Sequence, residues 1–169
     1  MEHIFTGKEV EKYFLAKPKY YIKFDRDTLQ QVAPDQIYRA KQKLIYKTIN
    51  KKLKIALDES ASLSTNSANI IIPSIEGYDI RAVMALLNSN LYSYLHLKMF
   101  GGVNKIAKEN LMSLPFPKIN EHQNKRLVEL VYDSVEKCND SELQAYINFS
   151  IFRLSEEEVR YIDRIYDSI

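Results

Sequence analysis

The clearest hydrophobic pattern along the chain lies between Asp79 and Gly101. Apolar residues recur there at intervals of three and four, the spacing that places side chains on one face of an α-helix. Asp79 stands before this run as an N-cap, and Gly101-Gly102 supplies the positive φ that ends a helix. We therefore predict one long helix over about residues 80–99. Its core-facing stripe consists of Ile80, Val83, Met84, Leu87, Leu91 and Leu95.

Shorter patterns before this helix predict strands. Segment 19–24 alternates apolar and cationic residues, as a half-buried strand does, and Ile70 to Ile72 is an apolar run stopped by Pro73. Segments 43–47 and 53–58 are further strand candidates, although the apolar spacing over 36–50 fits one helix equally well. The other expectations here are a helical turn over 7–13, a short helix over 28–34 and a polar loop over 60–69.

After the long helix, residues 111–116 predict an edge strand, because Pro115 and Pro117 remove backbone donors. Beyond residue 120 the pattern is helical, and Ser155 with Glu158 forms a capping box that starts a helix at Glu156. The predicted class is α+β, with a twisted, mostly antiparallel sheet packed by the long helix and followed by a helical tail. We place the α+β part over 1–118. The tail, 119–169, packs on it or on a partner domain.

Composition narrows the class of protein. Hydrophobic residues make up 46% of the chain and charged residues 27%, as in soluble globular proteins. No run approaches the ~18 apolar residues of a membrane-spanning helix and the N-terminus has no signal-peptide pattern, so we expect no membrane partner and a cytoplasmic protein. Cys138 stands alone in a helical pattern, where we expect it to pack. The histidines at 3, 96 and 122 do not have metal-ligand spacing.

The net charge of +2 conceals a strong asymmetry. Residues 1–55 contain 13 Lys/Arg and 6 Asp/Glu, a balance of +7, whereas residues 111–169 contain 7 and 11, a balance of −4. Such a division suggests that one face meets a polyanion and the other meets solvent or protein. A basic surface that is merely solvated remains the alternative.

The motifs of several enzyme classes are missing. No Asn or Asp precedes two prolines and an aromatic residue, as in DNA amino-methyltransferases, and there is no glycine-rich nucleotide loop. No acid lies two residues before a lysine, as in common metal-dependent nucleases, and no G-x-S-x-G elbow occurs. Asp58-Glu59 is a paired carboxylate, but adjacent side chains on a strand point to opposite faces, so we expect a solvated turn. We predict a chain without a catalytic site.

Seven short motifs occur in order along the chain. They are Thr6 to Val10 with Tyr13, Tyr20 to Asp25, Tyr38 to Tyr46, Ser60 to Pro73, Leu86 to Ser89, Gly101-Gly102, and Leu114 to Pro117. Together they resemble the TaqI-like C-terminal specificity domain of adenine-N6 DNA methyltransferases and fused type II restriction-methylation enzymes, with a looser likeness to specificity subunits of type I systems. The tail segment 151–163 is similar to the LYGLTEEE ending of many such proteins.

This resemblance implies a sequence-specific double-stranded DNA recognition module of a bacterial restriction-modification enzyme. It implies a separate methyltransferase or nuclease domain that the module directs to its site, with S-adenosylmethionine in the methyltransferase domain and no cofactor in this chain. The expected partners are DNA and that catalytic domain. The chain would then be either an excised C-terminal fragment or a separate specificity protein, and Met1 at the family's usual starting point favours the fragment.

Two sets of residues are expected at the DNA. Lysines of the basic half would contact phosphates, which positions a protein without reading sequence. Polar loop residues would reach base edges in the major groove, where Asn pairs with adenine and Lys with guanine. The phosphate set is Lys17, Lys19, Lys23, Lys41, Lys43, Lys47, Lys51 and Lys52. The base-reading set is Ser64, Thr65, Asn66, Asn104, Lys105 and Lys108.

Two other functions stay open at this point. The chain could be a protein-interaction or structural module whose helical tail docks a methyltransferase or nuclease subunit without reading DNA. It could also bind RNA, although it contains neither an aromatic RNP-type strand nor a GXXG loop. Salt-dependent duplex binding separates the first alternative from DNA recognition, since phosphate contacts give a steep salt dependence.

Overall fold

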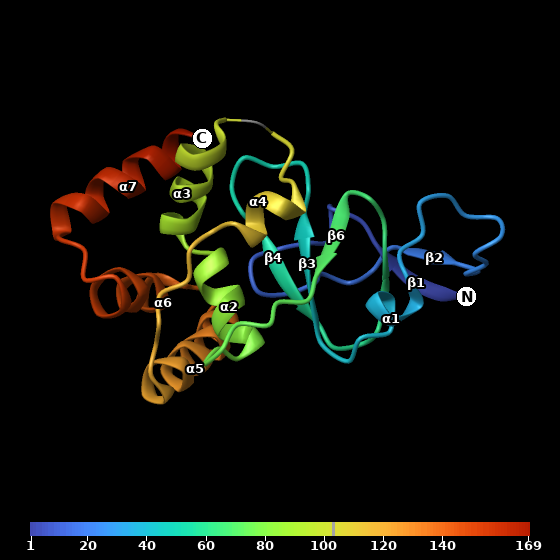
Figure 1. The fold of residues 1–169 in the computed structure, drawn as a ribbon, viewed down its shortest axis with the longest axis horizontal. Coiled ribbons are helices and arrows are strands. Elements are labelled where there is room, and N and C mark those ends of the chain that lie inside the picture. The colour runs from blue at the N-terminus through green and yellow to red at the C-terminus, as the bar shows by residue number, and fades with distance from the viewer. Residues whose placement is uncertain (103) are drawn as a thin grey trace.

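The computed structural model of the chain describes residues 1–102 and 104–169 and confirms the mixed α+β class. Helices of the C-terminal part lie at one end of the molecule, and the strands nearest the N-terminus lie at the other (Figure 1). A central sheet with its covering helices lies between them. The site described below lies at one edge of this sheet.

The central sheet contains three antiparallel strands in the order β4 (Ile55–Asp58), β3 (Lys43–Lys47) and β6 (Ala68–Ile71). Residues 36–50 therefore contain a strand and not the alternative helix. Leu44 on β3 faces the main core, whereas Ile45 faces a second apolar cluster. Because both faces of β3 are buried, its apolar run is continuous and does not alternate.

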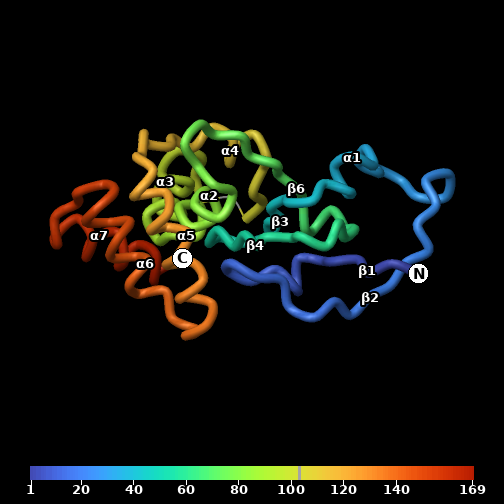
Figure 2. Tube along the Cα trace, turned by 90° about the horizontal axis from the view of Figure 1, so that it is seen from below, coloured from blue at the N-terminus to red at the C-terminus, as the bar shows by residue number. Residues whose placement is uncertain are grey.

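A second sheet joins the N-terminus to the middle of the chain. Its order is β2 (Tyr20–Ile22), β1 (Glu2–Phe5) and β5 (Leu63–Ser64), with β1 antiparallel to β2 and parallel to β5. It lies on one side of the central sheet, and Phe5 and Ile45 belong to the apolar cluster between the two sheets (Figure 2). The structure thus has two small sheets where one was predicted, because β1 and β5 are too short to show a period. The expected polar loop over 60–69 contributes β5 and the start of β6.

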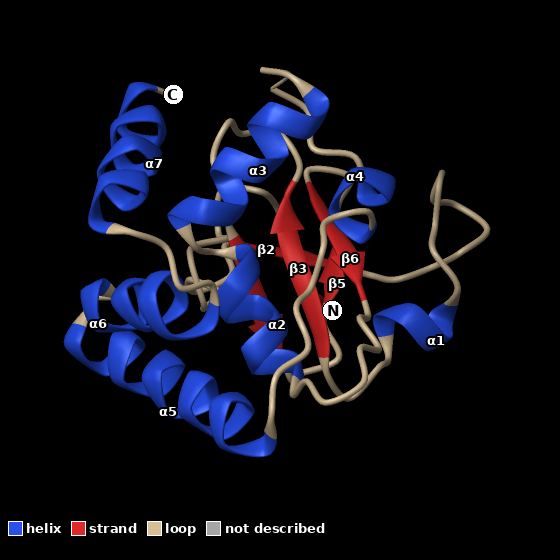
Figure 3. Cartoon of the chain, turned by 60° about the vertical axis from the view of Figure 1, so that its left-hand side comes forward, coloured by secondary structure: helices blue, strands red, loops and turns tan. Residues whose placement is uncertain are grey.

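The predicted long helix is interrupted. α2 (Ile80–Leu87) packs on the central sheet, and α3 (Asn90–Phe100) continues beyond a break at Asn88 and Ser89 (Figure 3). The Asn88 side chain bonds the backbone of Ile55 on strand β4, donating to the Ile55 oxygen at 2.7 Å and accepting from its N–H at 3.0 Å. Ser89 then caps α3 by accepting from the Tyr92 N–H. The break satisfies backbone groups at the edge of the sheet.

Two further segments differ from expectation. The predicted edge strand over 111–116 is not formed: α4 (Lys108–Met112) covers its first two residues, with Leu111 buried against the core and Met112 exposed. The following prolines lie in extended chain, where the Pro115 and Pro117 oxygens accept hydrogen bonds from tyrosine hydroxyls. The short helix placed over 28–34 is absent there. Instead, α1 (Asp35–Tyr38) begins directly after Pro34, because proline is tolerated at a helix start but not within a helix.

The tail forms α5 (Glu121–Lys137), α6 (Ser141–Ala145) with a π-helical continuation to Ile151, and α7 (Glu156–Ser168). The Ser155–Glu158 capping box is present as predicted, and Asn120 with Gln123 forms a second one. The tail shares the main core with α2 and the central sheet. Its buried apolar members are Leu127, Leu130, Val131, Leu143, Ile147 and Ile162.

Cys138 does not pack in the helix interior. It ends α5 in a left-handed conformation with a φ of 50°, and its side chain is exposed. The buried part of the α5 stripe ends before it, since Val135 is already exposed. Among the residues described, no helix combines the length and apolar character needed to cross a membrane.

Candidate nucleic-acid interface

A polar groove lies along β6, at the edge of the central sheet. Three segments line it: the turn after β5, the chain between Gln31 and Tyr38, and the chain from Lys105 into α4. The groove has a volume of about 480 Å³. The remaining lining residues carry amide, hydroxyl and charged groups, and its apolar surface comes from Ala33, Ile37, Tyr38, Tyr46, Ile70, Ile106 and Ala107. Such a mixture presents hydrogen-bonding groups against an apolar surface.

The groove brings together most of the predicted base-reading residues. Ser64 ends β5, Thr65 and Asn66 lie in the turn after it, and Lys105 and Lys108 come from a segment about forty residues further along the chain. Asn104, the sixth member, is exposed beside Lys105 but does not line the groove, and its backbone oxygen accepts from the Asn50 N–H at 2.8 Å. Ser64 is largely buried, so its side chain contributes less surface than that of Asn66, which is exposed.

The turn that contains Asn66 is fixed by neighbouring strands. The Thr65 N–H donates to the Phe5 oxygen at 2.9 Å, which ties the turn to β1. Thr48, at the end of β3, donates its hydroxyl to the Asn66 oxygen at 3.1 Å and its N–H to the Ser67 oxygen at the same distance. The Thr48 oxygen in turn accepts from the Ile106 N–H at 2.7 Å. Thr48 therefore hydrogen-bonds two of the segments that line the groove, the turn after β5 and the segment that contains Ile106.

Residues that the sequence did not mark as site residues also line the groove. The Asn66 Nδ2 donates to the Gln31 Oε1 at 3.0 Å, and Gln31 adopts a positive φ of 54°. Asn69 donates to the Tyr46 hydroxyl at 3.2 Å. Burial raises the pKa of Tyr46, so its hydroxyl keeps its proton and can also donate. No local signal identifies Gln31, since its partner lies 35 residues away.

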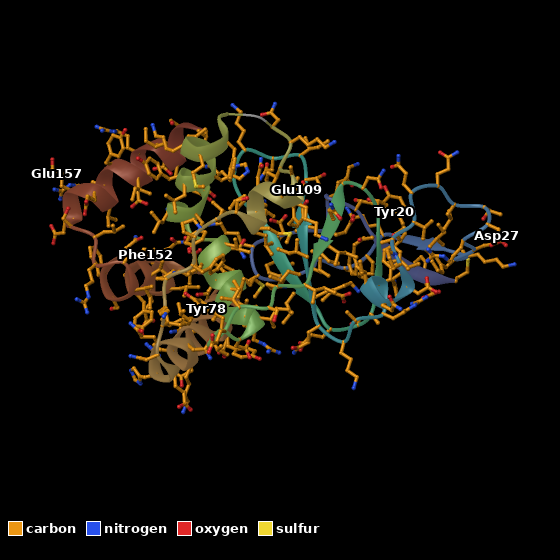
Figure 4. All side chains as sticks on the ribbon, in the orientation of Figure 1. Tyr20, Asp27, Tyr78, Glu109, Phe152 and Glu157 are labelled. Atoms are coloured by element: carbon orange, nitrogen blue, oxygen red, sulfur yellow. The ribbon has the colours of Figure 1, made fainter. Side chains whose placement is uncertain are left out.

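Glu109 adds the one carboxylate among the residues of the groove. It is exposed on α4 and is labelled beside the central sheet in Figure 4. A carboxylate accepts from the cytosine amino group, whereas the lysines of the groove match guanine acceptors and its amides match adenine. The groove therefore carries partners for different base edges.

Lys43 was predicted to contact phosphate, and the structure corrects this. Its side chain is completely buried on β3, where Nζ lies 2.7 Å from the Asp58 Oδ2 and donates to the Tyr38 oxygen at 2.6 Å. Asp58 is buried as well, which also corrects the solvated turn expected at Asp58-Glu59. Burial by itself would raise the pKa of Asp58, but hydrogen bonds from Lys43, Ser60 and Ser62 lower it below its ordinary value. The pair joins β3 to β4 inside the fold.

The other predicted lysines do not form one cluster. Lys47 lies at the surface near the groove, in a hollow next to Ser67. Lys17 lines a separate hollow that also includes residues of α5, and Lys52 lies over the Tyr166 ring of α7, 4.2 Å from its centre. These two lysines face the tail. The remaining exposed members are Lys19, Lys23, Lys41 and Lys51.

Within 1–102 and 104–169, no group of three His, Cys, Asp or Glu side chains lies close enough to hold a metal ion. The groove offers hydrogen-bond donors and acceptors and two ammonium groups. These groups suit binding and discrimination of a polar ligand. The domain thus combines an α+β fold with a groove that offers hydrogen-bonding groups and positive charge.

The family model described as a TaqI-like C-terminal specificity domain matches residues 2–116. The chain therefore belongs to the TaqI-like C-terminal specificity domain family. The match runs from β1 through α4 and includes every residue of the groove. Such a domain is generally non-catalytic and points to a DNA-recognition module of a restriction-modification enzyme. A search of the curated proteins found no match.

Proposed function

We propose that this chain reads the sequence of double-stranded DNA through the groove along β6 and directs a separate methyltransferase or nuclease domain to its site. The observation that carries the proposal is the convergence of Thr65, Asn66, Lys105 and Lys108 on one groove, from segments far apart in the sequence. Family membership supports the same ligand. S-adenosylmethionine would belong to the catalytic domain.

The chemistry of the groove supports discrimination among bases. The Asn66 amide keeps its oxygen and one N–H after donating to Gln31, so it can still make the paired contact that reads adenine. Gln31 fixes the orientation of that amide, which reduces the entropy lost when a base edge binds. Lys105 and Lys108 supply positive charge and donors for guanine acceptors.

The test is selection followed by substitution. The chain is incubated with a pool of random duplexes, the bound fraction is sequenced over several rounds, and the affinity for the selected duplex is measured by fluorescence anisotropy. Asn66→Ala should weaken binding to the selected duplex by about 1–3 kcal/mol and change affinity for an unrelated duplex much less. Lys118→Ala, at an exposed position outside the groove, is the control. If the native chain selects no sequence, or if Asn66→Ala leaves the preference unchanged, the proposal fails.

A second function is favoured by a different surface. Phe14, Tyr132 and Val135 are exposed apolar residues that line one hollow between the N-terminal segment and α5. This hollow shares no residue with the groove, so a catalytic domain could dock there while DNA occupies the groove. If docking were the only function, duplex affinity would be weak and nearly independent of salt.

A further inference from the structure

A second hollow adjoins the groove on the opposite side of the turn after β5. Its volume is about 310 Å³, and it is lined by the turn at Thr6 to Lys8 together with Tyr20, Lys47, Ile49 and Ser67. We propose that this hollow binds one backbone phosphate of the DNA strand whose bases enter the groove. The proposal rests on the proposed function. It adds Lys8 and Tyr20, which belong to neither of the two sets of residues expected at the DNA.

The turn at Gly7 lies directly on the wall of the groove. The Gly7 N–H donates to the Ser67 Oγ at 2.9 Å, and a Cβ at position 7 would lie 2.6 Å from the Ser67 backbone oxygen. A side chain at this position would therefore displace the turn. The Ser67 hydroxyl also lies 2.9 Å from that of Thr65, which lines the groove. The hollow and the groove thus share a wall formed by one short turn.

The donors available to an anion are side chains. The Lys8 N–H donates to the Thr6 hydroxyl at 3.2 Å, and the Glu9 N–H donates to the Thr6 oxygen at the same distance. The Thr6 hydroxyl in turn donates to the Glu9 carboxylate at 2.7 Å. With these backbone groups occupied, a phosphate in the hollow would be held by the ammonium groups of Lys8 and Lys47 and by the Tyr20 hydroxyl.

The charge of the hollow favours an anion. Throughout the part of the chain that the structure describes, neither Lys8 nor Lys47 forms an ion pair, so both charges remain uncompensated by a direct contact. The nearby Glu9 is buried, and its carboxylate bonds the Thr6 N–H and hydroxyl, which directs it to the turn itself. Two ammonium groups against one buried carboxylate leave a net positive site.

The position of the hollow suits a phosphate that sets register. Tyr20 belongs to β2, at the end of the molecule away from the acidic start of α7 marked by Glu157 (Figure 4). A strand that passes from the hollow into the groove would therefore remain far from the three glutamates of the first turn of α7. Phosphate contacts position a protein on DNA, and a contact next to Asn66 would fix which base pair faces that amide.

The experiment compares salt dependence in a set of variants. The affinity for the selected duplex is measured at several salt concentrations for the native chain, Lys8→Gln, Lys47→Gln and the double variant, with Lys118→Gln as the control. Loss of one phosphate contact should make the slope of log K against log salt shallower by about 1. Because both lysines would serve the same phosphate, the double variant should lose no more slope than a single variant. Circular dichroism confirms that each variant is folded.

A duplex with a single neutral methylphosphonate linkage identifies the ligand. At one linkage position, the methylphosphonate should weaken binding of the native chain by the same factor as Lys8→Gln weakens binding to the unmodified duplex. The same methylphosphonate should not weaken binding of the Lys8→Gln variant any further. Titration with inorganic phosphate, followed by NMR, tests a free anion as the ligand. If inorganic phosphate binds while no linkage position is coupled to Lys8, the DNA-phosphate proposal is overturned. The proposal is also overturned if the salt-dependence slopes of the single variants equal that of the native chain, or if the double variant loses the sum of the two single losses. In either case, sequence selection by the native chain would still support the proposed function.

Discussion

Replacing Lys43 with methionine would break the buried ion pair between β3 and β4 while keeping most of the side-chain volume. The Lys43 Nζ lies 2.7 Å from the Asp58 carboxylate, and the two side chains are exposed to only 0% and 2%. Removing one member of a buried pair leaves an uncompensated charge and typically costs about 3–5 kcal/mol. Asp58 would keep hydrogen bonds of 2.9 Å from the Ser60 and Ser62 N–H groups, so we expect about 3 kcal/mol.

The loss should depend on pH with a definite sign. In the native chain, burial alone would raise the pKa of Asp58. Hydrogen bonds from Lys43 and the backbone outweigh this effect and bring the pKa below its value in the unfolded chain. The stabilisation is therefore complete above the unfolded-state pKa and disappears as pH falls through the folded-state pKa. Without Lys43 the effect of burial dominates, the pKa of Asp58 rises, and protonation removes the buried charge. The deficit of Lys43→Met should therefore shrink towards about pH 4.

Urea unfolding followed by circular dichroism measures this at neutral and acidic pH. The Lys43→Met, Asp58→Asn double variant is the matched control, and it should recover much of the lost stability because no charge remains buried. A deficit below about 1 kcal/mol, the value of a surface pair, would refute the reasoning. So would a single variant that is no less stable than the double variant.

Two further outcomes are expected. Asn88→Ala should lower the free energy of unfolding by about 2 kcal/mol or more, because the Ile55 N–H and oxygen lose their hydrogen-bond partner. Ser89→Ala should lower it by only about 1 kcal/mol, the value of a lost helix cap. Equal losses for the two variants in urea unfolding would contradict this. Burial lowers the pKa of His96 below 6.5, so the unfolded chain takes up a proton at a higher pH than the folded chain does, and the free energy of unfolding should fall as pH drops through about 6.5. Denaturant unfolding at several pH values measures this loss, which His96→Leu should lack. Identical pH profiles for the native chain and the variant would contradict the prediction.

The features predicted correctly from sequence are those that depend on near neighbours. The Ser155–Glu158 capping box lies within one helical turn, and Asp79 bonds the amide of Arg81 two residues away. Apolar spacing also predicted helical structure correctly in the tail and after Asp79, where two helices replace the single long helix expected. The mixed α+β class follows from these elements, because strand-like and helix-like segments occupy different parts of the chain.

The features that were missed depend on contacts between distant residues. Lys43 is as cationic in the sequence as Lys47, and only its register opposite Asp58 places it inside the fold. The break in the long helix requires Asn88 to meet Ile55, 33 residues earlier. Gln31 became part of the groove through Asn66 in the same way. Hydrophobic spacing carries no information about such pairings, so the groove could be anticipated by residue type but not by geometry.

The core that the tail shares with the family-matched segment affects which part of the chain can be exchanged between related proteins. Six apolar side chains of the tail are buried in the same cluster as Leu86 and Leu87 of α2. A chimera that exchanged only the family-matched segment 2–116 would set these side chains against foreign neighbours. Core packing is sensitive to changes of even one methylene group. The smallest portable unit of this protein therefore extends through α7.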